Sequence, residues 1–354
     1  MDKEWESSDY QDALADLNLE LQQNTDNIEA YYARSELFYT LDDYQAGIKD
    51  LDAILQRNSK EALAYMLRGY GCGKLENYLQ AITDYSTAID LYPNYAKAYF
   101  NRGTIRHKLE QYQAAIADFN LAIQLDPNYA DAYYNRAIVQ NKIGQYQQAI
   151  SDYNEVIRLQ PEDEAAYYNR GNTHNKIKEY SLALDDYNRA IAINPQDLEA
   201  YYNRANVYHK TKLYSQAIAD YDLVIKSNPS HAPTYYNRGT TNLAAQNIEL
   251  AIADFTQAIK LKPDYAEAYY NRAVAYNKSK AYQKAIAGHQ KAIELKSDYA
   301  EAYGNLGLVY QTVGEKLQAI NNLEQAAKLF KQQDNQPLYE YVEEKLMAIR
   351  KLGK

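Results

Sequence analysis

One segment of the chain has part of the glycine spacing of a phosphate-binding loop. Residues 68–76 read RGYGCGKLE, in which a lysine follows a glycine as it does in loops that cradle nucleotide phosphates. The segment lacks the glycine required five residues before Gly73, and Leu75 stands where Ser or Thr must bind magnesium. We therefore predict that these glycines belong to a helix, in which each interior glycine costs about 1 kcal/mol relative to alanine.

The other residues with potential for catalysis or metal binding are five histidines and one cysteine. The histidines, at positions 107, 174, 209, 231 and 289, never fall at the spacing of metal ligands. Cys72 has no His–Asp pairing that would mark it as a nucleophile, so we expect it to be a small packing residue. The sequence therefore predicts no enzyme, no cofactor and no metal site.

Opposite charges recur along the chain at a constant interval of 34 residues. The arginines are Arg34, Arg68, Arg102, Arg136, Arg170, Arg204, Arg238 and Arg272. The aspartates are Asp16, Asp50, Asp84, Asp118, Asp152, Asp186, Asp220 and Asp254. An unpaired charge inside a helical array would be costly to bury, so this pattern indicates ion pairs with a structural role.

Side chains that suit peptide binding keep the same interval. The asparagines are Asn101, Asn135, Asn169, Asn203, Asn237, Asn271 and Asn305. Tyrosine precedes five of them, as Tyr134, Tyr168, Tyr202, Tyr236 and Tyr270, and the lysines include Lys108, Lys142, Lys176 and Lys210. A carboxamide both donates and accepts hydrogen bonds, and a tyrosine adds a large contact area with a polar tip.

These intervals belong to one repeat of 34 residues. Tyrosine stands nine times at this spacing from Tyr31 to Tyr303, and a small residue follows sixteen positions after each one. Glycine marks a second small position in five of the units, and proline closes six of them. A unit of this kind resembles the tetratricopeptide repeat. The sequence YYNRG, which recurs in the repeats, is similar to that of tetratricopeptide arrays abundant in cyanobacteria.

The resemblance implies an all-α fold, a right-handed superhelical solenoid of antiparallel helix pairs. We predict nine repeats, at 28–61, 62–95, 96–129, 130–163, 164–197, 198–231, 232–265, 266–299 and 300–333. Apolar residues at spacings of three and four in 132–161, interrupted at Gly144 and ended by Pro161, independently indicate a helix–turn–helix. A single hairpin cannot bury both of its faces, so stacking must supply the core.

The two ends of the chain are predicted to differ from the repeats. Residues 1–27 are interpreted as an N-terminal half-repeat that supplies only a second helix. Residues 334–354 are interpreted as a C-terminal capping helix with Leu338, Val342, Leu346 and Ile349 in its apolar stripe. A membrane-surface helix is the alternative for this last segment, but the mixed charge of its other face favours a cap.

Two pairings are possible for the arginines and aspartates. The family usually has leucine at the arginine position, so each arginine needs a partner. If the pairs form within a repeat, Arg272 faces Gly288 and lacks a carboxylate. If each aspartate pairs with the arginine of the following repeat, Gly288 faces Leu306, so the aspartate and the arginine are both absent at the same junction. We therefore predict a ladder between repeats that includes Asp118–Arg136, Asp152–Arg170 and Asp186–Arg204.

In this family the first helices line a concave groove, and the resemblance places the asparagines, tyrosines and lysines there. The asparagine line resembles the ladder in the repeat domain of O-linked N-acetylglucosamine transferase. We predict that it holds the backbone of an extended peptide and that the lysines attract acidic side chains. The alternative is that the asparagines only help the repeats to pack. The carboxylate clamp of chaperone-binding relatives is not predicted, because no repeat has its lysine at the position of Tyr134.

Composition limits the class of partner. The net charge of −9 argues against nonspecific binding to nucleic acid or to an anionic membrane. No apolar run approaches the roughly 18–20 residues that span a bilayer, and the N-terminal residues lack the pattern of a secretory signal. We therefore expect a cytoplasmic protein with no membrane insertion.

The sequence predicts a non-catalytic scaffold that binds a protein or peptide partner in its groove. Two other functions stay open. A self-assembling structural protein would use the uncovered half-repeat to dock on a second copy of the chain. Nucleic-acid binding through the lysines would show a steep dependence on salt concentration.

Overall fold

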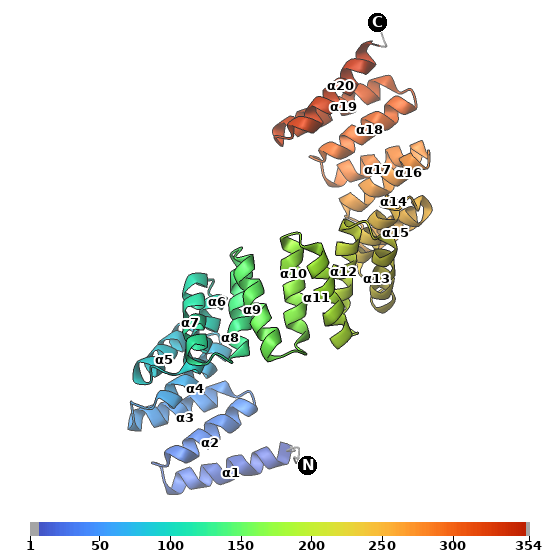
Figure 1. Cartoon of the computed structure of the whole chain (residues 1–354). Helices are drawn as coiled ribbons and strands as arrows, with labels where there is room; N and C mark the ends of the chain where they lie inside the picture. The colour runs from blue at the N-terminus through green and yellow to red at the C-terminus, as the bar shows by residue number, and fades with distance from the viewer. Residues whose placement is uncertain (1–6, 352–354) are drawn as a thin grey trace. The chain divides into compact units, whose positions relative to one another are not determined.

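The computed structural model describes residues 7–351 of the chain, and these residues form twenty α-helices and no strand. The predicted all-α class is confirmed, because consecutive helices pack as antiparallel pairs in a solenoid (Figure 1). The chain divides into two compact units, Met1–Ile177 and Lys178–Lys354. Residues 1–6 of the predicted half-repeat and 352–354 of the predicted cap lie outside the described residues.

The first unit contains the helices α1 to α10, and each helix from α1 to α9 packs against the next one in sequence. Their bounds are α1 Ser7–Gln23, α2 Ile28–Thr40, α3 Tyr44–Arg57, α4 Ala62–Lys74, α5 Tyr78–Leu91, α6 Ala96–Lys108, α7 Tyr112–Leu125, α8 Ala130–Lys142, α9 Tyr146–Leu159 and α10 Glu164–Lys176. The even-numbered helices are the first helices of the hairpins, and α4, α6 and α8 also contact one another directly.

The second unit contains the helices α11 to α20, which pack in the same sequential way. Their bounds are α11 Tyr180–Ile193, α12 Leu198–Lys210, α13 Tyr214–Ser227, α14 Ala232–Ala244, α15 Ile248–Leu261, α16 Ala266–Lys278, α17 Tyr282–Leu295, α18 Ala300–Thr312, α19 Lys316–Gln332 and α20 Gln336–Lys351. Here α12, α14, α16 and α18 are first helices.

A left-handed residue reverses the chain between the two helices of a hairpin. The backbone φ is 59° at Glu110, 63° at Lys212 and 80° at Gly144. After the left-handed Glu110, the N–H of Gln111 donates to the carbonyl of Arg106 at 2.8 Å, which closes the end of α6 as a Schellman-type cap does. The same turn at each hairpin lets two helices of constant length face each other.

Small residues allow the paired helices to approach closely. The alanine of the second helix is fully buried, as at Ala115 and Ala149. The small residue of the first helix lies under an aromatic ring, since a Cβ on Gly103 would come within 2.9 Å of the Phe119 ring. The 34-residue pattern of small and aromatic residues is therefore the packing pattern of the core.

Helix α20 covers the apolar face that the last hairpin would otherwise expose. Its buried residues Val342, Leu346 and Ile349 belong to the same cluster as Leu323 and Phe330 of α19. Three residues of the predicted apolar stripe thus pack on protein, whereas Leu338 is exposed. At the other end of the chain, α1 packs on α2 and buries Leu21.

Candidate peptide-binding face

The arginine–aspartate pairs join the two helices of the same repeat. Arg136 donates from Nε and Nη2 to the two carboxylate oxygens of Asp152, at 2.7 and 2.6 Å. The same fork-shaped contact joins Arg34 to Asp50, Arg68 to Asp84, Arg102 to Asp118, Arg204 to Asp220 and Arg238 to Asp254. The aspartates are buried, and bidentate contact with a guanidinium is the geometry that best compensates a buried carboxylate.

The predicted pairing between repeats is therefore wrong. Asp118 is held by Arg102 rather than Arg136, and Arg204 binds Asp220 rather than Asp186. Likewise, Asp152 is held by Arg136 and not by Arg170. The reason is geometric: positions sixteen residues apart face each other across an antiparallel hairpin, so a carboxylate of the same repeat is the nearest one.

Each arginine still reaches the preceding repeat through its third nitrogen. Nη1 of Arg136 donates to Oδ1 of Asn120 at 2.5 Å, and Nη1 of Arg170 donates to Asn154 at 2.6 Å. Nη1 of Arg204 makes the same contact with Asn188 at 2.7 Å. These acceptors lie two residues after the predicted aspartates. The link between repeats therefore exists, but a polar side chain that the sequence analysis missed makes it.

The eighth repeat has the arginine without its carboxylate. Nε of Arg272 is buried and without a hydrogen-bond partner among the described residues, because Gly288 occupies the aspartate position. Its Nη1 still donates to Thr256 at 3.1 Å, and its guanidinium lies 5.4 Å from the centre of the Tyr269 ring. The eighth repeat therefore has the arrangement that the predicted pairing between repeats would avoid.

The predicted asparagine line lies half-buried on the first helices, where most of its amide nitrogens bond within the protein. Nδ2 of Asn169 donates to the Tyr134 hydroxyl at 2.9 Å, and Nδ2 of Asn237 donates to that of Tyr202 at 2.8 Å. Asn271 and Asn305 make the same bond to Tyr236 and Tyr270, at 2.9 and 2.7 Å. Asn135 instead donates to the carbonyl of Asp131, and Asn101 contacts the Met66 sulfur at 3.8 Å.

These bonds leave the amide oxygens available. Oδ1 of Asn169, Asn237 and Asn271 accepts no hydrogen bond within the described residues, so each can accept one from a peptide N–H. Burial raises the pKa of Tyr134, Tyr202, Tyr236 and Tyr270, so these phenols keep their proton while they accept the bond from asparagine. The phenols thereby hold the asparagine side chains in one orientation.

The predicted lysines stand exposed at the ends of the first helices. Nζ of Lys108 lies 5.7 Å from the centre of the Tyr78 ring, and Nζ of Lys176 lies 5.8 Å from that of Tyr146. Lys210 lies over Tyr180 at 5.8 Å, while Lys142 is exposed. Contact with a ring face keeps an ammonium ordered without neutralising its charge.

Two hollows in the first unit bring these residue types together. The Asn101 hollow, about 670 Å³ including space open to solvent, is lined by Asn101 with Lys74 and Lys108. The Asn169 hollow, about 650 Å³, is lined by Asn169, Lys176 and three further asparagines at 141, 172 and 175. The structure therefore places the predicted asparagines and lysines on one surface in each of these two places.

The cysteine and the histidines that were considered for catalysis or metal binding lie among packing and hydrogen-bonding contacts of the repeats. Cys72 is buried, and burial raises the pKa of its thiol to about 11, which keeps it protonated. Nδ1 of His209 lies 2.9 Å from the Thr241 hydroxyl of the next first helix. Within residues 7–351, no group of three or more His, Cys, Asp or Glu side chains could hold a metal ion.

Models of known families match the chain along most of its repeats. A model described as tetratricopeptide repeat matches 96–129, 130–163, 164–197 and 198–231. A second, described as TPR repeat, matches 72–110 and 243–280, and a third, again described as tetratricopeptide repeat, matches 264–332. The chain belongs to the tetratricopeptide repeat family. No curated protein sequence matches it.

Solved structures similar to this tetratricopeptide repeat protein share its fold. The C-terminal part of a repeat protein from Cytophaga hutchinsonii is 20% identical over 65% of this chain and 95% of its own, with a TM-score of 0.57. A tetratricopeptide repeat protein from Parabacteroides merdae is 20% identical over 70% and 98%, with a TM-score of 0.50. YrrB, described as a TPR protein with an unusual peptide-binding site, is 26% identical over 52% and 95%, with a TM-score of 0.48.

Family membership gives the general function. Tetratricopeptide repeats form scaffolds for protein–protein interaction, and this chain is such a scaffold. None of the helices formed by residues 7–351 is both long and apolar enough to cross a membrane.

Proposed function

We propose that this tetratricopeptide repeat protein binds an extended, acidic peptide segment of a partner along its first helices. The observation that supports this most directly is the Asn101 hollow, whose lining combines an asparagine with lysine side chains. Amide groups can bond a peptide backbone whatever its sequence, and the ammonium groups favour acidic side chains. The Asn169 hollow repeats this combination.

The charge preference can be tested with fluorescently labelled peptides of equal length that are acidic, neutral or basic. We expect wild type to bind the acidic peptide at least ten-fold more tightly than the basic one, with an affinity that falls as salt rises. Lys108→Glu combined with Lys176→Glu is expected to remove this preference, because both lysines line the hollows. Equal binding of acidic and basic peptides by wild type would contradict the proposal.

The role of the asparagines needs a control, because their amide nitrogens also bond tyrosine hydroxyls. Asn169→Ala with Asn237→Ala removes both the bond to tyrosine and the free amide oxygen. Tyr134→Phe with Tyr202→Phe removes the same internal bonds and keeps the asparagines. Loss of peptide binding in the first pair alone assigns recognition to the asparagines, whereas equal loss in both pairs makes them structural.

Self-association through the N-terminal half-repeat is the second candidate. It is favoured by Leu19 of α1, whose residue surface is 54% exposed although the residue is apolar. Light scattering of the full chain and of a variant lacking residues 1–27 tests it. A mass that rises with concentration only in the full chain supports it, and one mass in both contradicts it.

A further inference from the structure

Eight of the nine first helices carry a large side chain at the same position. These residues are Tyr32, Met66, Phe100, Tyr134, Tyr168, Tyr202, Tyr236 and Tyr270. In the second unit the Tyr236 ring lies 5.9 Å from the Phe255 ring of the second helix and 4.9 Å from the Tyr265 ring. The ring thus fills the space between one first helix and the elements that follow it.

The ninth repeat has Gly304 at this position. A Cβ placed on Gly304 would meet only the Cβ of Ala326, at 3.8 Å, whereas a Cβ on Gly307 would lie 2.7 Å from Leu323. Gly304 is buried, but a Cβ there would make only an ordinary van der Waals contact, so no close approach of helices requires a glycine. The missing ring leaves a pocket there, the Gly304 pocket, that encloses about 480 Å³ including space open to solvent.

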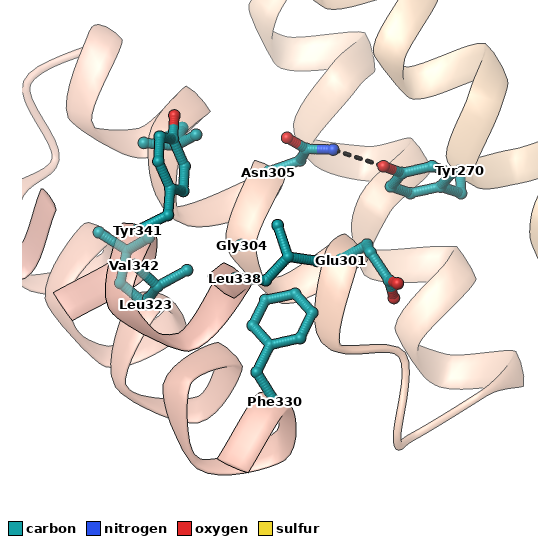
Figure 2. Close-up of a pocket in the computed structure, with 10 residues that line it drawn as sticks. Tyr270, Glu301, Gly304, Asn305, Leu323, Phe330, Leu338, Tyr341 and Val342 are labelled. Atoms are coloured by element: carbon teal, nitrogen blue, oxygen red, sulfur yellow. Dashed lines mark hydrogen bonds between the residues drawn. The ribbon is translucent and has the colours of Figure 1, made fainter. Parts of the chain in front are cut away.

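The walls of the Gly304 pocket are apolar and come from four helices (Figure 2). Leu323 and Phe330 of α19 line it, together with Leu338 and Val342 of α20. Leu323 stands where the other repeats place the ring or side chain that their tyrosine packs on. An occupant would therefore find the apolar contacts that an internal tyrosine has in the repeats before it.

Beside the hydroxyls of Tyr270 and Tyr341, the Gly304 pocket offers a carboxylate and an amide oxygen as acceptors. Glu301 lines it and is exposed, and its carboxylate oxygens can accept hydrogen bonds. Nδ2 of Asn305 donates to the Tyr270 hydroxyl at 2.7 Å, which leaves the amide oxygen of Asn305 free to accept. Apolar walls with two acceptors fit a flat apolar group that carries a donor.

We propose that the Gly304 pocket binds an aromatic side chain with a hydrogen-bond donor, tyrosine or tryptophan, from a partner protein. The partner's ring takes the place that tyrosine occupies inside the preceding repeats, and its O–H or N–H donates to Glu301 or Asn305. The proposal is independent of the acidic peptide, because the residues of the pocket belong to α16, α18, α19 and α20 and include none of the lysines that line the two hollows.

The test uses the full chain and the N-acetyl amides of tyrosine, tryptophan, phenylalanine, leucine and alanine as probes. Binding is followed by the NMR shifts of the backbone amides of Gly304 and Gly307. For probes of this size we expect dissociation constants on the order of 1 mM for tyrosine and tryptophan amides. Phenylalanine amide should bind about three-fold to ten-fold more weakly, and alanine amide should not bind.

Two variants complete the test. Gly304→Tyr places in the pocket the ring that most other repeats carry, and it should keep its helicity and lose at least ten-fold in affinity for tyrosine amide. Glu301→Ala should remove the preference for tyrosine over phenylalanine without loss of phenylalanine binding. If Gly304→Tyr fails to fold, the wild-type probe series still decides the question.

Several outcomes would overturn the proposal. Wild type that shifts neither glycine amide with tyrosine amide has no such site. Equal affinity for leucine and tyrosine amides would make the pocket a general apolar contact. A wild-type mass in light scattering that falls to that of a single chain in Gly304→Tyr would assign the pocket to a second copy. Failure of the acidic-peptide experiments leaves all of these measurements unaffected.

Discussion

At the scale of single residues, the arginine fork is the main departure from an ordinary helical hairpin. One guanidinium binds a buried carboxylate in its own repeat with two nitrogens and a polar group of the preceding repeat with the third. A planar group with donors in a fixed arrangement can do this, whereas lysine offers only one point of charge. The arginine therefore stabilises the hairpin and its junction together.

A double-mutant cycle distinguishes this geometry from the pairing that the sequence suggested. We expect Arg136→Ala and Asp152→Ala to show a coupling energy of about 2 kcal/mol in chemical denaturation. The same cycle on Arg136 and Asp118 should give less than about 0.5 kcal/mol, because Arg102 holds that carboxylate. A larger coupling energy for Arg136 and Asp118 than for Arg136 and Asp152 would support pairing between repeats instead.

His289 is a second residue-scale feature, and it makes stability depend on pH. It is fully buried, neither ring nitrogen has a partner within the described residues, and burial lowers its pKa to about 4. Its ordinary pKa is about 6.5. Between these two values the unfolded chain binds the proton and the folded chain does not, so the free energy of unfolding falls as pH falls from about 6.5 to 4.

We expect the second unit to lose about 2 kcal/mol of stability from this residue between pH 7 and pH 5. His289→Phe should remove that loss, because Phe119 and Phe255 occupy the same repeat position elsewhere. Urea unfolding of wild type and variant at both pH values measures this loss of stability. The contribution of the carboxylates is the same in the two proteins, so it cancels when their losses are compared. An equal loss in the two proteins would show that folded His289 takes up the proton.

At the scale of elements, the turn inside most hairpins holds a residue whose type does not suit a left-handed backbone, whereas Gly144 and Gly314 do suit it. Lys212 has a φ of 63°, in the left-handed region that glycine adopts without strain. We expect Lys212→Gly to raise the free energy of unfolding by about 1 kcal/mol. Ala219→Gly, in the middle of α13, is the matched control and should lower it by about 1 kcal/mol. Thermal or urea unfolding compares the two, and destabilisation by both would mean that the turn is unstrained.

The end elements solve a problem that the inner ones do not have. An inner hairpin is covered on both sides, whereas the last one needs α20 to bury Leu323 and Phe330. The ninth repeat is the one repeat of the nine that has no large side chain at the Gly304 position. Residues of α20 line the pocket beside Gly304. The cap thus gives the array both an end and a distinct pocket.

At the scale of the whole molecule, contacts in each unit run between neighbours in sequence. Such an array behaves as a chain of locally coupled modules, so a core defect should act mainly near its own position. We expect Leu51→Ala to raise hydrogen exchange in the first unit and to leave α18 to α20 unchanged. Leu346→Ala should do the converse, each at a local cost of about 2–5 kcal/mol.

Both leucines are buried, with 0% and 1% of their surface exposed, which makes the pair well matched. Mass-spectrometric hydrogen exchange on the two variants and on Met347→Ala, an exposed control in α20, reads the result. Increased exchange along the full chain after either substitution would mean that the array unfolds as one cooperative block.

The sequence by itself determined the helical class, the period and the positions of the small and aromatic residues. It could do so because one packing solution is repeated nine times, and a constraint repeated that often is visible without coordinates. It also singled out the arginines and aspartates as partners in ion pairs, since buried opposite charges need each other.

Only the tertiary structure decided which partners meet. Asp118 and Asp152 lie at equivalent positions in neighbouring repeats, so the periodic sequence offers both to Arg136, and the antiparallel hairpin selects Asp152. The tertiary structure also showed that the asparagine amides bond tyrosine hydroxyls. It showed further that Gly304 borders an open pocket, whereas Gly103 lies under a ring. Periodicity fixes position along the chain, but the distance between side chains depends on how helices cross and what covers them.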